Sequence, residues 1–160
     1  MDFTYKNALE HREDMALLYQ EYNELLLRTD PDFEACLAMQ NFEREIEDLP
    51  VKYAPPQSML LIVYEGDVPA ACAGIKYFAP GICELKRMYV RPAFRNRGLG
   101  RQLCELMFQE AQQRGYEKMY LDTMPGLASA VRMYRGFGFY EIAKYYPNPV
   151  ENVIYLCYDL

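Results

Sequence analysis

Apolar residues recur at helical spacing in two long stretches of the chain. Over residues 14–28 they stand three or four positions apart, and Asp30 and Pro31 end the repeat. Over residues 98–114 they again share one helical face, and Gly115 follows where a glycine cap is expected. Each stretch is therefore predicted to form an amphipathic helix. Further helices are predicted over residues 31–48 and in LASAVRMYRGFG, and the proline-marked LPVKYAPPQ is predicted to be a loop.

Shorter apolar runs predict the strands. DFTYKNAL and EKMYLDT predict single strands, and MLLIVYEGDVPAACAGIKYF predicts two strands around a turn at residues 65–67. GICELKRMYV predicts the next strand, and FYEIAKYY and NVIYLCYDL predict two closing strands around residues 147–149. The order is helices, a strand meander, and then strands alternating with helices. We therefore expect an α/β (α+β) fold in which helices pack on a mixed sheet.

Length and composition limit the class of protein. The 160 residues, 51% of them hydrophobic, suffice for one well-buried core, so residues 1–160 are predicted to form a single domain. The sequence has no apolar run of about 18 residues, and its start lacks the basic-then-apolar order of a signal peptide. We expect a soluble, cytoplasmic protein with no membrane partner.

Cysteine and histidine content disfavours several chemistries. The five cysteines are scattered with no C-x-x-C pair, which argues against a disulfide framework or a zinc site; they are Cys36, Cys72, Cys83, Cys104 and Cys157. The one histidine, His11, lies in a polar run and would have to serve any Ser/His or Cys/His pair. We predict neither a metal site nor a catalytic triad.

Charge is unevenly distributed along the chain. Residues 1–50 hold thirteen Asp/Glu against four Lys/Arg, and the remainder holds ten against thirteen, which together give the formal net charge of −6. An acidic N-terminal third is not the broad basic face that nucleic-acid binding requires, so no nucleic-acid partner is expected.

Arginines gather around two glycines in RNRGLGRQ, residues 95–102. A strand, a turn and glycines that open a helix together form an anion site, because the first N–H groups of a helix lack intrahelical acceptors and glycine lets a phosphate approach the backbone. The pattern matches neither a P-loop nor a dinucleotide turn, which would need a third glycine at Leu103. A pyrophosphate is the expected ligand. The alternative is that the glycines merely relieve crowding at a strand-to-helix turn.

Two motifs in order resemble one known family. Arg95-x-x-Gly98-x-Gly100 after LKRMYVRPAF resembles the acetyl-CoA signature of the GNAT superfamily of N-acetyltransferases, and AVRMYRGFGF resembles its later A-x-x-x-Y-x-x-x-G-F motif. The resemblance is strong over residues 59–141. It implies a mixed, mostly antiparallel sheet with a central splayed parallel strand pair, flanked by helices. Where many relatives carry asparagine, seven residues before the motif tyrosine, this chain has Leu127.

The resemblance implies acetyl-CoA as co-substrate and a set of residues that contact it. The backbone of residues 95–100 would hold the pyrophosphate, and Arg91, Arg97, Arg101 or Arg135 would approach the outer phosphates. The preceding strand would pair with pantetheine. The complete implied contact set is Met88, Tyr89, Val90, Arg95, Asn96, Arg97, Gly98, Leu99, Gly100, Arg101, Tyr134 and Arg135.

Acyl transfer to an amine needs a base, an oxyanion site and a proton donor for the thiolate. In the family the motif tyrosine, here Tyr134, is the general acid, and a phenol of pKa about 10 suits that task. A glutamate at the position of Glu84 is the base in some members. Regular alternation predicts that Glu84 shares a sheet face with Met88; the alternative is that it only balances Lys86 or Arg87. A backbone N–H near Met88 or Val90 is expected to meet the oxyanion.

The acceptor is less well defined by the sequence. In the family the N-terminal helices and the loop between the last two strands contact it; here these carry acidic residues and the aromatic YYPNPVEN, which favours a primary, cationic amine. The acidic residues are Glu34, Glu43, Glu45, Glu47 and Asp48. Two alternatives stay open: a non-catalytic acyl-CoA sensor, and a transferase that uses another acyl-CoA or a hydroxyl acceptor. A homodimer, common in the family, has no clear signal in the sequence.

Overall fold

The computed structural model describes residues 2–29, 42–148 and 150–160, and these form one seven-stranded sheet with the order β1-β2-β3-β4-β5-β7-β6. Its strands are β1 (Phe3–Asn7), β2 (Met59–Glu65), β3 (Val68–Ala79), β4 (Ile82–Val90), β5 (Lys118–Thr123), β6 (Tyr140–Glu141) and β7 (Ile154–Asp159). Neighbouring strands pair antiparallel except β4 and β5, which run parallel at the centre. The predicted mixed, mostly antiparallel sheet is confirmed.

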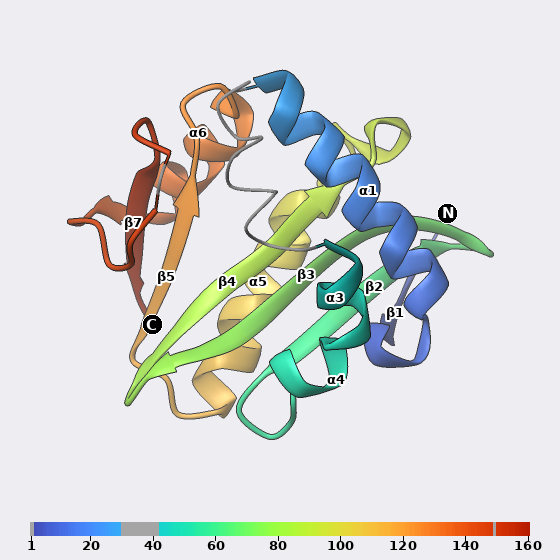
Figure 1. Ribbon diagram of the computed structural model, residues 1–160, viewed down its shortest axis with the longest axis horizontal. Coiled ribbons are helices and arrows are strands. Elements are labelled where there is room, and N and C mark those ends of the chain that lie inside the picture. Colours follow the sequence, from blue (N-terminus) through green and yellow to red (C-terminus); the bar gives the residue numbers. More distant parts are fainter. Residues whose placement is uncertain (1, 30–41, 149) are drawn as a thin grey trace.

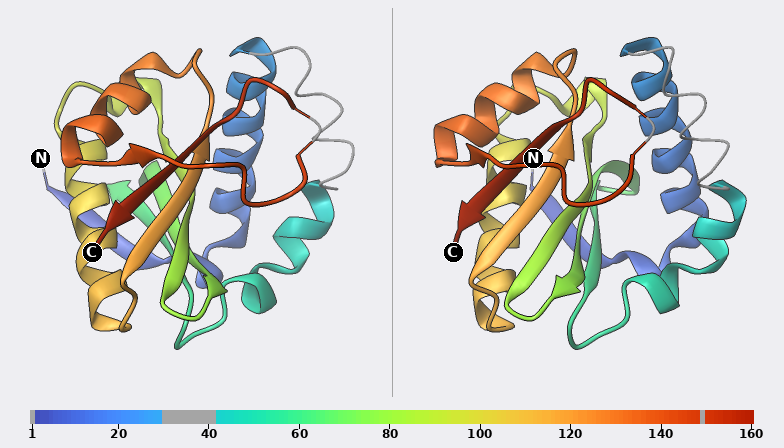
Figure 2. Two further views of the ribbon diagram at one scale, coloured as in Figure 1. Left: turned by 90° about the vertical axis from the view of Figure 1, so that its left-hand side faces the viewer. Right: turned by 60° about the vertical axis from the view of Figure 1, so that its left-hand side comes forward.

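Helices cover both faces of this sheet, as Figures 1 and 2 show. They are α1 (Arg12–Thr29), α3 (Phe42–Glu47), α4 (Leu49–Lys52), α5 (Leu99–Gln113) and α6 (Ala128–Phe137), with short 3-10 turns at Ala8–Glu10 and Pro92–Phe94. Helices α5 and α6 lie on one face, and α1, α3 and α4 lie on the other. Apolar side chains at helical spacing explain the packing, since Leu103, Met107 and Ala111 of α5 are fully buried against the sheet.

The central strands β4 and β5 separate along their length. They pair only from Ile82 and Lys118 to Glu84 and Tyr120. Beyond these pairs the two strands diverge, as Figure 1 shows. The predicted splayed parallel pair is therefore present, and it leaves the facing edges of β4 and β5 without a strand partner.

A β-bulge interrupts β4 within the diverging part. Between the pairs Cys72–Tyr89 and Gly74–Lys86, β3 has one residue and β4 has two. The bulge includes Arg87, whose φ of 55° lies in the left-handed region that few residues other than glycine adopt.

The bulge changes which side chains face each side of the sheet. Leu85 packs into the core beneath α5, and beyond the bulge Met88 packs against the same core. Glu84 precedes Leu85 and faces the opposite side, toward α1. The expectation that Glu84 and Met88 share a face is therefore wrong, because the extra residue shifts the alternation by one position.

Several predicted elements differ from the observed ones. The predicted loop LPVKYAPPQ begins with helix α4, where Pro50 sits in the first turn and its missing N–H costs nothing. FYEIAKYY forms only the two-residue strand β6. Residues 31–41 of one predicted helix lie outside the described residues, and helix α3 occupies the part that follows. Among the described helices, none is both long enough and apolar enough to cross a bilayer.

Candidate active site

The turn between β4 and α5 is the segment predicted to bind an anion. Asn96 and Gly98 adopt positive φ values of 62° and 78°, and Gly98 is the N-cap of α5 without a side-chain cap. A Cβ added at Gly98 would meet nothing within 4 Å. Glycine is therefore needed here for backbone conformation rather than for core packing, and it leaves the N-terminus of the helix open.

The backbone N–H groups of residues 96–101 are available to a ligand. The first bond of the helix runs from the Gln102 N–H to the Gly98 carbonyl at 3.0 Å. Among the described residues, no acceptor takes the six N–H groups that precede it. The Arg95 N–H, by contrast, donates to the Pro92 carbonyl at 3.3 Å. The free donors and the helix dipole favour an anion, and the set begins at Asn96, one residue later than predicted.

Two of the predicted phosphate-contacting arginines have partners elsewhere. Arg91 forms an ion pair with Glu21 of α1 at 3.0 Å, and Arg97 pairs with Glu65 of β2. The Arg95 side chain donates to the Val90 carbonyl at 2.9 Å, which ties the turn to the end of β4.

Arg101 and Arg135 are more open to a ligand. The Arg101 guanidinium lies 4.7 Å from the centre of the Phe137 ring, so it bridges α5 and α6, and its side chain is 65% exposed. Arg135 is also exposed and lies 3.6 Å from Glu141. Arg101 also pairs with Glu105 of the same helix at 3.3 Å, but both of these pairs are exposed and therefore weak, so an outer phosphate can compete for either arginine.

A cavity of about 100 Å³ lies where β4 and β5 diverge. Its walls come from α1, β4, β5, α6 and the loop before β7, and they include Met88 and Leu127. Tyr89 and Val90, predicted to contact the cofactor, do not line it. Tyr89 faces the core beneath α1, and Val90 packs on the α5 side. The cavity thus passes between the two strands from one face of the sheet toward the other.

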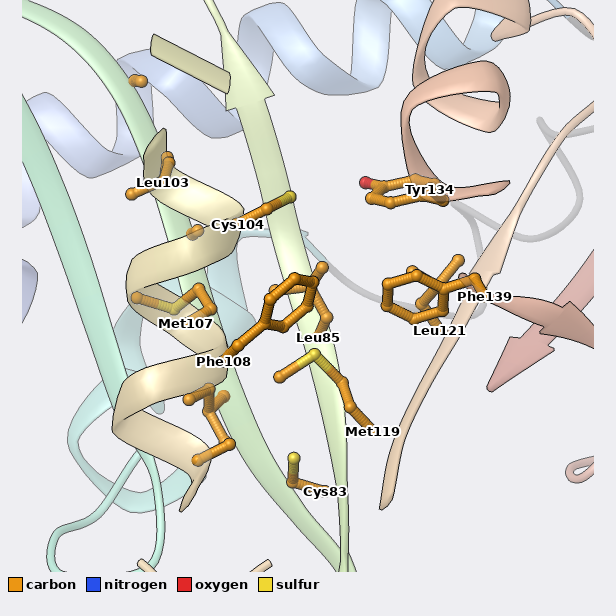
Figure 3. Close-up of a cluster of buried hydrophobic side chains, with 14 of the residues drawn as sticks. Cys83, Leu85, Leu103, Cys104, Met107, Phe108, Met119, Leu121, Tyr134 and Phe139 are labelled. Carbon is orange, nitrogen blue, oxygen red and sulfur yellow. The ribbon is translucent and has the colours of Figure 1, made fainter. Parts of the chain in front are cut away.

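Tyr134 of α6 forms part of the cavity wall. The whole residue is 5% exposed, and its ring packs edge-on against the Phe139 ring, with 5.5 Å between the ring centres. Figure 3 shows the hydroxyl directed toward α5, from which Cys104 points back. Among the described residues nothing hydrogen-bonds this hydroxyl. Burial raises the pKa of Tyr134 well above its usual value, so the phenol keeps its proton at neutral pH.

Glu84 lies outside the cavity wall, where β4 and β5 are still paired. Its carboxylate accepts a hydrogen bond from the Tyr145 hydroxyl at 3.0 Å and lies 3.4 Å from the Lys86 ammonium. The residue is 6% exposed. The structure therefore places Glu84 near the predicted site but covered by Tyr145, with an ion-pair partner of its own.

The acidic residues of the N-terminal third do not form a free acidic face in the described residues. Glu45 is buried and pairs with both Arg87 and Lys52. Burial opposes its ionisation, but the charge and hydrogen bonds of Arg87 and Lys52 outweigh this effect and hold the pKa of Glu45 below its usual range. Arg44 and Asp48 pair at the surface. Glu34 and the side chain of Glu43 lie outside what the structure describes.

Asp122 is a cavity residue that sequence reasoning missed. It follows the last paired residue of β5 by two positions, on the face that carries Glu84 and α1. Its carboxylate accepts a hydrogen bond of 2.5 Å from Tyr146, which lies in the predicted aromatic loop and also lines the cavity. No local motif identifies such a residue, because its exposure to the cavity depends on the separation of two strands.

Among the described residues no cluster of three or more His, Cys, Asp or Glu side chains could hold a metal.

Comparison with known proteins agrees with this geometry. Residues 15–139 match the model of the acetyltransferase (GNAT) family. The chain is 37% identical over 146 residues, 90% of its length and 85% of the relative's, to an uncharacterized N-acetyltransferase of Schizosaccharomyces pombe.

Two solved structures share the fold. The chain is similar to PaiA N-acetyltransferase from Thermoplasma acidophilum in complex with coenzyme A, with a TM-score of 0.81, 12% identity and full coverage of both chains. It is also similar to a GNAT family acetyltransferase from Elizabethkingia anophelis with acetyl-CoA bound, with a TM-score of 0.57, 22% identity, and 71% of this chain and 83% of that one covered.

Proposed function

Since the chain belongs to the acetyltransferase (GNAT) family, we propose that it transfers an acetyl group from acetyl-CoA to a primary amine by direct attack within a ternary complex. One observation carries the proposal. A cavity passes between the diverging strands β4 and β5, with Tyr134 in its wall and the open N-terminus of α5 on the same face of the sheet as that tyrosine.

The cofactor is proposed to bind from the α5 and α6 face. The free N–H groups of residues 96–101 are suited to the pyrophosphate, and Arg101 or Arg135 is suited to the 3′-phosphate. The unpaired edge of β4 beyond Glu84 offers backbone groups to the pantetheine arm and to the oxyanion. Leu127 and Met88 give the cavity an apolar wall where an acetyl group would lie. The solved relatives from T. acidophilum and E. anophelis, which carry coenzyme A and acetyl-CoA, support this ligand class.

Tyr134 is proposed to donate the proton that the departing thiolate requires. Its raised pKa keeps the hydroxyl protonated, and the absence of any bonded partner among the described residues leaves the proton available. The burial that raises the pKa of the phenol also disfavours a free thiolate in the same cavity, so we expect the proton to move as the C–S bond breaks. Acyl transfer to a neutral amine needs no further cofactor.

Coenzyme A release from acetyl-CoA, followed with a thiol reagent over a panel of primary amines, tests the proposal. We expect amine-dependent release, and a rise in melting temperature with coenzyme A alone. A protein that binds coenzyme A but releases none with any amine would behave as the acyl-CoA sensor instead. Competition by longer acyl-CoA esters tests the second alternative, because a cavity of about 100 Å³ should disfavour long acyl chains.

A further inference from the structure

We propose that Asp122 binds the ammonium group of a cationic acceptor amine and takes a proton from it before attack. The inference rests on the proposed function and adds to it an acceptor class and a residue. Its basis is the balance of charge in the cavity, the position of Asp122 in the fold, and the hydrogen bonds that hold its carboxylate.

Charge balance singles out Asp122 among the residues that line the cavity. The charged residues of the described wall are Lys86, Arg87 and Asp122. Lys86 pairs with Glu84, and Arg87 pairs with Glu45. Asp122 has no cation within ion-pair distance among the described residues. Both positive charges of the wall are thus already balanced, and the unbalanced charge is negative, which suits a cation.

The position of Asp122 suits an acceptor that enters opposite the cofactor. Asp122 lies beyond the last β4–β5 pair and faces the α1 side of the sheet, whereas Tyr134 reaches the cavity from α6 on the other side. An amine held by Asp122 would meet the thioester between the strands, with the proposed proton donor beyond it. The amine could then add to one face of the thioester carbonyl while the sulfur that departs stays near Tyr134.

The loop before β7 holds the Asp122 carboxylate in place. The Tyr146 hydroxyl donates to Oδ2 at 2.5 Å, and the Asn148 amide donates to the Tyr146 oxygen at 2.7 Å. No described residue donates to Oδ1. One carboxylate oxygen is therefore fixed by the protein and the other is left for a ligand, which is the arrangement that a single ammonium requires.

The other ionisable groups near Asp122 are poor proton acceptors at neutral pH. Tyr22 of α1, Tyr134 of α6, and Tyr145 and Tyr146 of the loop carry phenols. Burial raises the pKa of Tyr22 to about 12, and the charge of Asp122 adds to the rise. Burial, with the charges of Asp122 and Glu84, also raises the pKa of Tyr145. Tyr155 lies opposite Asp122 on β7 and adds a further phenol, and Lys86 and Arg87 are cationic. The carboxylate of Asp122 is the one anionic group among them.

The step balances as follows. The ammonium gives one proton to Asp122 and becomes a neutral amine, whose lone pair forms the C–N bond to the thioester carbonyl. The C–S bond breaks, and the thiolate takes a proton from Tyr134. The tyrosine recovers a proton from the nitrogen of the new amide, and Asp122 returns its proton to solvent. The products are the acetylated amine, coenzyme A and one proton.

The chain contains a matched control for this proposal. Glu84 and Asp122 are both carboxylates on the α1 face, and each is hydrogen-bonded by one of two consecutive tyrosines. Only Asp122 lines the cavity. The variants D122N and E84Q each change a carboxylate to an amide of similar shape, so a difference between them reports access to the acceptor.

The experiment measures amine binding to the coenzyme A complex by calorimetry, and kcat/KM against pH. We expect D122N to bind protonated amines at least about 10-fold more weakly and to lose about 100- to 10,000-fold in kcat/KM at pH 7. The deficit in kcat/KM should shrink as the pH approaches the pKa of an alkylammonium, about 10.4. With an amine that is uncharged at pH 7, D122N should match the parent. E84Q leaves the charge of Lys86 in the cavity wall without its partner, so we expect it to weaken amine binding less than D122N does and to keep the parent pH dependence.

Two outcomes would overturn the inference: a D122N protein that binds and acetylates protonated amines like the parent, or an E84Q protein that alone shows the deficit. A parent complex that binds amines through Asp122 yet transfers no acetyl group would leave the ammonium site intact and overturn the proposed function, and with it the proton transfer. If D122N does not fold, Tyr146→Phe removes only the hydroxyl that orients Oδ2, and a rise in KM without a change in coenzyme A affinity is then expected.

Discussion

The two faces of the sheet around the diverging strands are built by different means. On the α5 face the predicted anion site comes from one continuous segment, residues 91–101, and its donors are backbone N–H groups. On the α1 side the wall comes from α1, β4, β5 and the loop before β7, and its polar groups are side chains. Backbone donors keep their chemistry whatever the side chains are, whereas a side-chain site is lost with one substitution. A constant ligand suits the first side, and a ligand that differs among relatives suits the second.

The largest expected effect comes from a side chain placed on the backbone-built side. Gly98→Val should abolish coenzyme A binding, because Cβ atoms would block approach to two or more charge-assisted bonds, a loss of about 3–6 kcal/mol. Calorimetry measures the affinity, and circular dichroism measures folding.

Gly115→Val is the matched control, since both glycines have φ near 80° and an added Cβ meets nothing within 4 Å at either. The control carries the same backbone strain, about 1–3 kcal/mol, at the other end of the same helix. Equal loss of binding in both variants would show that strain, and not blocked access, is responsible.

A smaller effect is expected where the two sides meet. Tyr134→Phe should reduce kcat by about 10- to 1000-fold and leave coenzyme A affinity and stability nearly unchanged, because the hydroxyl has no bonded partner among the described residues. Tyr116→Phe is the control: its hydroxyl donates to the Gln57 carbonyl at 2.8 Å, so this variant should lose about 1 kcal/mol of stability and keep its turnover. Unchanged turnover in Tyr134→Phe would assign the proton to solvent.

Removing an arginine side chain near the turn at residues 96–101 should reduce the free energy of coenzyme A binding less than blocking the backbone N–H groups does. Arg101→Ala should weaken coenzyme A binding by about 1.5–3 kcal/mol and leave dephospho-coenzyme A binding unchanged, if Arg101 contacts the 3′-phosphate. Arg97→Ala should affect both ligands little, because Arg97 already pairs with Glu65. A loss with Arg97→Ala as large as with Arg101→Ala would contradict this assignment.

The smallest expected effect concerns acid stability on the side-chain-built side. The pKa of Glu45 is lowered in the folded protein, so its ionised form stabilises the fold above the unfolded pKa, and this stabilisation is lost as the pH falls through the folded pKa. In Glu45→Gln the free energy of unfolding should therefore depend less on pH below about 4.3. Denaturant titrations at several acidic pH values measure it, and an unchanged slope would contradict the assignment.

The glycine turn that opens α5 could be predicted from the sequence because its requirements are local. The left-handed conformation at Gly98, the helix that follows and the absence of a cap are all properties of one short segment. The same is true of the cap at Gly115 and of Tyr134, whose motif covers residues 130–139 and ends at the C-terminal cap of one helix. The family resemblance therefore points to the same segment whose backbone donors the structure leaves open.

The acceptor side could not be predicted in this way, because its geometry depends on distant residues. Arg87 adopts a positive φ that its own side chain disfavours, and its buried pairing with Glu45 is a contact 42 positions apart in the sequence. That bulge turns Glu84 away from the face of Met88. Asp122 becomes a cavity residue only because β4 and β5 separate, which alternation along β5 does not reveal.

The two consecutive tyrosines of the loop before β7 link the geometry of two strands to one short segment. Tyr145 is bonded to Glu84 on β4, and Tyr146 to Asp122 on β5, so one short segment sets the environment of both carboxylates. An insertion or deletion in this segment would disturb both bonds together. Acceptor preference should therefore change abruptly rather than gradually among related proteins. Grafting this loop alone into a relative should transfer both hydrogen bonds to the carboxylates.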